Sequence, residues 1–212
     1  SDLNKLKEFA KQVEENRSKI DEKNENYNPT FFAKIVREGS DLLGNVKNPD
    51  FFIPLKDFVM DKSSETFGDV AFNAWDKLHK KMGDKVPIVS IENPPAGSGI
   101  SRAADIEKLI LASRDKFEKK AIKAGYSKDE AEKAAEKMIG ATWDVGHINM
   151  IKKYGYTDKQ LLKETETIAK YVKHVHLSDN FGMEHTELPM GMGNVPLKGE
   201  LEKLKKAGFK GS

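Results

Sequence analysis

The sequence contains no cysteine among its 212 residues. This absence excludes a disulfide scaffold, a thiolate nucleophile and a zinc site with cysteine ligands. Any metal ligands must therefore be histidine, aspartate or glutamate side chains. The lack of cysteine, together with many lysine and glutamate residues, also resembles the composition of thermophile proteins.

Long apolar runs are missing as well. No stretch of about 18 apolar residues occurs, which is the length that a membrane-spanning helix needs. The first ten residues, SDLNKLKEFA, lack the apolar centre of a signal peptide. We therefore expect a soluble, cytoplasmic protein without a membrane partner.

The chain also lacks a strong excess of charge of one sign. Lysine and arginine number 36, aspartate and glutamate 34, and the formal net charge is +2. Dedicated nucleic-acid binders usually show a marked basic excess, so nucleic acid is not an expected partner. No glycine-rich dinucleotide or P-loop motif follows a predicted strand, so neither phosphate-binding fold is supported.

Two halves of the chain differ in their patterning. Residues 1–85 are helix-rich, with expected helices over 31–43 and from Ser64 to about 82. Residues 86–212 alternate short β-branched runs, at 86–92, 141–145 and 171–177, with helical segments. Two of these helices open with capping boxes, formed by Ser127 with Glu130 and by Thr157 with Gln160.

This alternation predicts an α/β fold in which parallel strands are joined by helical crossovers. Both a (β/α)8 barrel and an open doubly wound sheet fit the pattern. We therefore expect two parts, a helix-rich N-terminal part over 1–85 and a βα part over 86–212.

Ionisable residues stand at the carboxyl end of each predicted strand. They are Glu92, Asp144 and His176. Neighbouring parallel strands lie about 4.8 Å apart, so these side chains could converge on one divalent cation such as Mn, Mg, Co or Zn. Taken singly, each could be a helix cap or a solvated loop residue. Their occurrence on three successive strands favours a metal site.

The loop over 178–196 is long for a connection between a strand and a helix. It holds Asp179, His185 and the pair Gly191 and Gly193. Long polar loops at this end of a parallel sheet typically act as lids or contact substrate, although a plain surface loop is the alternative.

Four motifs give the chain a specific resemblance. At these residues it resembles the xylose isomerase-like TIM-barrel superfamily, which includes sugar isomerases and epimerases and the endonuclease IV type of DNA-repair enzyme. The resemblance covers about residues 86–212, and the set of motifs is more specific than any one of them. The motifs are Ile91–Asn93, Asp144–His147, His174–Asp179 and Gly191–Pro196.

The resemblance implies a (β/α)8 TIM barrel with metal ligands at Glu92, Asp144 and His176. It also implies that His147 contacts substrate or metal. The family's fourth ligand, a glutamate, would lie on a strand that follows this sequence. The endonuclease branch has an Asp-x-His in the loop after the third strand, where this chain has Met183-Glu184-His185. This departure favours the sugar branch.

A complete barrel has eight strands in about 250 residues, and only three strands are evident here. We therefore expect the barrel to be incomplete in this chain. It could be a piece of a longer chain, lack internal segments, or be completed by another chain, which would make the protein a homo-oligomer.

The leading hypothesis is a metal-dependent isomerase or epimerase of a small sugar or polyol. A metal-polarised carbonyl would allow a carboxylate to move the neighbouring carbon-bound proton, and Glu92 is the candidate base. His147 would hold a sugar hydroxyl, with Asp179 or His185 contributed by the loop. The alternatives are an endonuclease IV-like phosphodiesterase and a non-catalytic binding module.

Overall fold

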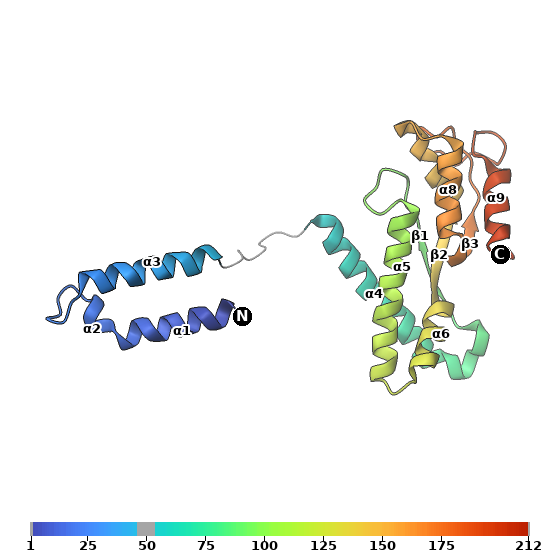
Figure 1. The fold of residues 1–212 in the computed structure, drawn as a ribbon. Helices are drawn as coiled ribbons and strands as arrows, with labels where there is room; N and C mark the ends of the chain where they lie inside the picture. Colours follow the sequence, from blue (N-terminus) through green and yellow to red (C-terminus); the bar gives the residue numbers. More distant parts are fainter. Residues whose placement is uncertain (1, 46–53, 212) are drawn as a thin grey trace. The chain divides into compact units, whose positions relative to one another are not determined.

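The structure is a computed structural model that describes residues 2–45 and 54–211, and it divides into two compact units. The first unit is helical, with α1 (Asp2–Glu15), α2 (Arg17–Ile20) and α3 (Pro29–Asn45) (Figure 1). Helix α3 contains the predicted 31–43 helix and confirms it. Amphipathic spacing is sufficient to predict these helices, because it follows the period of the helix itself.

The second unit begins with the long helix α4 (Leu55–Met82), which packs against α5 (Ala103–Lys123). The prediction that this helix starts at Ser64 is wrong. It starts directly after Pro54, whose missing N–H costs nothing at a helix start. Ser64 instead lies buried in the helix interior, where its hydroxyl donates to the Asp61 carbonyl.

Three parallel strands form the sheet, in the order β1 (Val89–Glu92), β2 (Ile139–Asp144) and β3 (Val172–His176). The crossovers contain α5 and α6 (Lys128–Met138), then α7 (Val145–Asn149) and α8 (Asp158–Ile168), and α9 (Leu197–Lys206) follows β3. The short 3-10 turns are η1 (Gly83–Lys85), η2 (Met150–Tyr154) and η3 (Ala169–Tyr171). This arrangement confirms the predicted parallel α/β fold. Both predicted capping boxes are also present.

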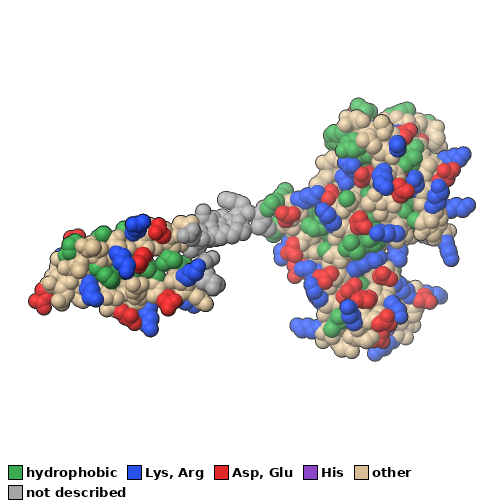
Figure 2. Space-filling view, in the orientation of Figure 1, with side chains coloured by type: hydrophobic (Ala, Val, Ile, Leu, Met, Phe, Trp, Pro, Cys, Tyr) green, Lys and Arg blue, Asp and Glu red, His purple; other side chains and the backbone are tan. Residues whose placement is uncertain are grey.

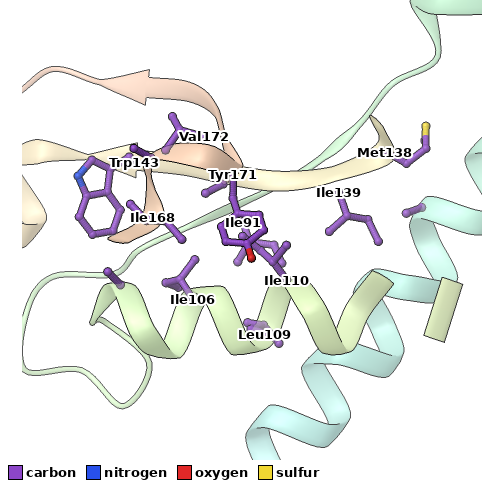
Figure 3. Close-up of a cluster of buried hydrophobic side chains, with 14 of the residues drawn as sticks. Ile91, Ile106, Leu109, Ile110, Met138, Ile139, Trp143, Ile168, Tyr171 and Val172 are labelled. Carbon is purple, nitrogen blue, oxygen red and sulfur yellow. The ribbon is translucent and has the colours of Figure 1, made fainter. Parts of the chain in front are cut away.

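The hydrophobic core fills the space between the sheet and its helices (Figure 3). Ile91 from β1 and Trp143 from β2 are buried there with Ile110 of α5. The Trp143 indole donates to the Thr165 hydroxyl of α8 at 2.9 Å, so its one polar atom is satisfied. Because alternate residues of a strand point to opposite faces, this packing leaves a second, polar face on the sheet.

The boundary between the two units falls between residues 53 and 54, whereas the composition changes near residue 86. Helix α4 therefore belongs to the α/β unit. No strand occurs in the described residues before 86. The assignment of residues 86–212 to the barrel, and of residues 1–85 to a separate helix-rich part, stays a prediction.

The surface of the second unit carries mixed charge. In the view of Figure 2, basic and acidic side chains alternate over it without a large region of one sign. In the described residues, no helix is both long and apolar enough to cross a membrane.

Candidate metal centre

The polar face of the sheet brings the predicted residues together. Glu92 and Ser90 share this face of β1, and the Ser90 hydroxyl lies 2.7 Å from the Thr142 hydroxyl of β2. Asp144 stands two residues after Thr142 and pairs in register with His176 of β3. The strand register therefore places acid, acid and imidazole at one end of one face.

Side-chain distances show that these groups form a cluster. The Glu92 Oε1 atom lies 3.0 Å from His176 Nδ1 and 3.7 Å from His147 Nδ1. Asp144 Oδ2 lies 3.7 Å from His147 Nε2 and 3.8 Å from His176 Nδ1. Two carboxylates and two imidazoles thus meet, and the expected convergence of Glu92, Asp144 and His176 is present in the geometry.

Three of these residues have donor atoms spaced closely enough to hold one metal ion. Each of Glu92, Asp144 and His147 offers one donor atom, and the three atoms lie within 4.8 Å of one another. The carboxylate oxygens and the imidazole nitrogen are donors that Mn, Co, Zn or Mg accept to different degrees. The donor chemistry therefore fits a divalent cation. The resemblance implied only that His147 contacts substrate or metal, and it named His176 as the histidine ligand. We propose that His147 is a ligand, either together with His176 or in its place.

The backbone of Asp144 is fixed by a buried asparagine from the neighbouring strand end. Asn93 is fully buried, accepts the Asp144 N–H at 2.8 Å and donates to the Asp144 carbonyl at 3.1 Å. The Asp144 carboxylate in turn accepts the His147 N–H at 2.9 Å and caps α7. These hydrogen bonds therefore fix both the backbone and the carboxylate of Asp144 in one position.

The partners of His147 determine which tautomer its neutral ring adopts. Its Nδ1 lies 2.7 Å from the Asn93 carbonyl oxygen, which can only accept. The neutral ring thus carries its proton on Nδ1 and a lone pair on Nε2. Nε2 lies 2.8 Å from Nε2 of His185, which must then be the donor. The bond from Nδ1 to the Asn93 carbonyl is of the kind that orients metal-binding histidines in proteins.

Asp179 was expected to contact substrate from a lid. The structure instead shows it 2% exposed, with Oδ1 accepting the N–H groups of Asn180 and Val195 and Oδ2 that of Gly191. Burial opposes ionisation, but the backbone N–H donors, Gly193 among them, outweigh it and lower the pKa of Asp179. Its oxygens thus accept backbone N–H groups of the loop, and its expected contact with substrate stays a prediction.

His185 is the loop residue that reaches the cluster. Its imidazole is partly exposed and stacks at a tilt on His147, with ring centroids 4.6 Å apart. Glu187 lies 3.8 Å from its Nε2 atom on the outer side. The expectation that the loop supplies a histidine near the site agrees with this position, while its role in binding substrate stays a prediction.

Sequence reasoning assigned no role to Asn93, Asn180 or Gly146. Asn93 follows β1 directly, and Asn180 lies four residues after the end of β3, so a polar residue close to a strand end was the available signal. Gly146 is needed for close approach, because a Cβ there would lie 2.1 Å from the Ser178 hydroxyl. The partners of all three are distant in sequence, so the pattern alone could not reveal them.

Residues 118–212 match the family model described as xylose isomerase-like TIM barrel. This match confirms the resemblance to the xylose isomerase-like TIM-barrel superfamily over these residues. The matched segment contains Asp144, His147, His176 and the whole loop, whereas Glu92 lies before it. The family and the parallel sheet agree on a barrel-type α/β fold, and the completion of the barrel remains a prediction.

Two further comparisons concern individual proteins. An uncharacterized protein of Methanocaldococcus jannaschii is 33% identical over 75 residues, which are 35% of this chain and 24% of that protein. The chain thus spans about a quarter of this curated relative. A crystal structure of a D-tagatose 3-epimerase-like protein shares 18% identity and a TM-score of 0.38, over 88% of this chain and 75% of that one.

Proposed function

We propose that the xylose isomerase-like segment is part of a divalent-metal-dependent isomerase or epimerase that acts on a small sugar or polyol. The observation that carries the proposal is the convergence of Glu92, Asp144, His147 and His176 at the carboxyl ends of three parallel strands. Active sites of barrel folds are built at this end. The family description agrees with this chemistry.

Asp144 and His147 are suited to hold the ion, because both are nearly buried and fixed by further hydrogen bonds. Glu92 and His176 complete the donor set from the neighbouring strands. A bound divalent metal would supply a Lewis acid that polarises a substrate carbonyl.

Glu92 is suited to move a proton. Its side chain is 40% exposed, so it is open to a substrate, and His176 Nδ1 donates to its Oε1 at 3.0 Å. A carboxylate in this position can accept the proton from the carbon next to the carbonyl and return it. His176 would orient that carboxylate, and the exposed His185 could donate to a sugar hydroxyl.

The test is metal binding by the full chain, measured by titration with Mn²⁺ and Co²⁺. We expect one ion per chain, with affinity reduced at least about 100-fold in Asp144→Asn and His147→Ala. Asp129→Asn, on α6 at the other end of β2, is the matched control and should bind normally. Equal affinities in all four proteins would contradict the proposal.

A second candidate is a metal-dependent phosphodiesterase of the endonuclease IV type. The contact between His147 and His185 favours it, since it adds an imidazole beside the cluster and that branch uses several zinc ions. The same titration separates the two, because this candidate requires more than one Zn²⁺ per chain and salt-dependent binding of DNA.

A further inference from the structure

We propose that Asp179 and Asn180 are positioning residues that fold the loop over 178–196 into one fixed shape and thereby hold His185 against His147. The inference deepens the proposed function, since it names what builds the loop side of that metal centre. In this proposal the loop does not act as a lid but has one fixed conformation beside the metal centre.

Asp179 closes the loop on itself. Its main chain pairs with Leu188 through two hydrogen bonds of 2.9 Å, and its carboxylate accepts N–H groups from both ends of the loop. The charge on Asp179 strengthens those bonds, because backbone donors bind an ionised acceptor more tightly. The Asp179 carboxylate thus connects the two ends of a segment of some 16 residues, from Asn180 to Val195.

Asn180 ties the folded loop to the metal centre. It is fully buried, and its Nδ2 donates to the Gly146 carbonyl at 2.8 Å, in the turn that carries His147. Its Oδ1 accepts from Gly182 N–H and from Asn149 Nδ2, at 2.8 and 2.9 Å. One side chain therefore connects the loop to the Asp144–His147 turn.

The backbone of the loop packs tightly against Asp179 and Asn180 at Gly193. A Cβ on Gly193 would lie 2.3 Å from Asp179 Oδ1 and 2.4 Å from the Asn180 carbonyl. Asn194 adds an outer bond, since its Oδ1 accepts from Asn149 Nδ2 at 2.8 Å. His185, in the middle of the loop, is thus placed by contacts that lie far from it in the chain.

Two near-isosteric variants test these links separately. Asp179→Asn replaces one carboxylate oxygen, which accepts from either one or two backbone N–H groups, by an NH2 group. Asn180→Asp sets an oxygen against the Gly146 carbonyl. Asp129→Asn and the exposed Asn73→Asp on α4 are the matched controls. Asn194→Ala, at an exposed position, is a milder variant that should fold even if the buried ones do not.

The first readout needs no metal. In the free protein, Asp179→Asn should accelerate amide exchange at least about tenfold at Gly191 or at Val195, whichever N–H faces the new NH2 group and so loses its acceptor. Asn194→Ala removes no acceptor of these two amides and should accelerate their exchange less. Imidazole nitrogen NMR should show the hydrogen bond between His147 and His185 weakened in Asp179→Asn and Asn180→Asp, and intact in both controls. An unchanged imidazole spectrum in folded variants would overturn the proposal.

The second readout is a double-mutant cycle in Co²⁺ affinity. Two imidazole nitrogens that share a proton can also face one cation, so His185→Ala should weaken Co²⁺ binding about tenfold. If Asp179 acts through His185, Asp179→Asn should weaken it similarly, and the double variant no further. Additive losses would mean that Asp179 acts elsewhere. A wild-type chain that binds no Co²⁺ would refute the metal centre, and the imidazole spectrum would then decide the positioning role alone.

Discussion

The two units of the chain contrast in how much they bury. Of residues 4–44, whose side chains the structure describes, only Ile35 is buried, while Val36 and Leu43 on α3 are 52% and 68% exposed. In the second unit, Phe117 and Trp143 are completely buried within one cluster. Both units have regular helices, yet only the second joins distant segments into a core, which is where folding stability comes from.

This contrast predicts that core substitutions act very differently in the two units. Phe117→Ala should destabilise the second unit by about 4 kcal/mol, because it removes a ring packed edge-on against Phe72 and tilted against Trp75. Both tryptophans, Trp75 and Trp143, belong to this unit, so tryptophan fluorescence during urea unfolding reports on it alone.

Ile35→Ala is the matched change in the first unit. It should leave the tryptophan transition in place and lower only the helical signal in far-ultraviolet circular dichroism. A tryptophan transition shifted as far by Ile35→Ala as by Phe117→Ala would show that the two units unfold together.

A buried acid should make the stability of the second unit depend on pH. Glu200 on α9 is fully buried, hydrogen-bonded to Thr165, and its burial raises the pKa to about 7. Its folded pKa lies above its unfolded value, so the native state binds more protons between about pH 4.5 and 7, and stability must fall as pH rises through that window. The expected loss is about 3 kcal/mol.

Glu200→Gln should abolish this pH dependence and make the protein more stable than wild type at pH 8. Urea unfolding followed by tryptophan fluorescence at pH 5 and pH 8 measures both effects. Equal wild-type stability at the two pH values would contradict a buried, protonated Glu200.

The smallest expected effect concerns a helix start. Ser127→Ala removes the hydroxyl that accepts the Glu130 N–H in the capping box of α6 and should cost about 1 kcal/mol. Ser18→Ala, at an exposed position of α2 in the first unit, is the control and should leave the same transition unchanged. A cost that is equal for the two variants would argue that the box contributes nothing.

Local rules account for the parts of the fold that were predicted. The capping boxes at Ser127 and Thr157 depend on residues three positions apart, and the strands over 139–144 and 172–176 on short apolar runs. The start of α4 was missed because the apolar run over 51–60 contains Pro54 and could be read as a strand or as a helix. The acids and imidazoles at the strand ends were predicted because parallel strands end at the same edge.

The sequence by itself determined the helical and strand periods, the capped helix starts and the presence of acids and imidazoles at the strand ends, since all of these depend on neighbours along the chain. Tertiary structure decided that His147 joins the cluster, that Asp179 serves the loop, and that Asn93 and Asn180 hold the site. These roles depend on hydrogen bonds between segments brought together only by folding. A side chain's partner across the sheet is set by strand register and loop path, which no local pattern encodes.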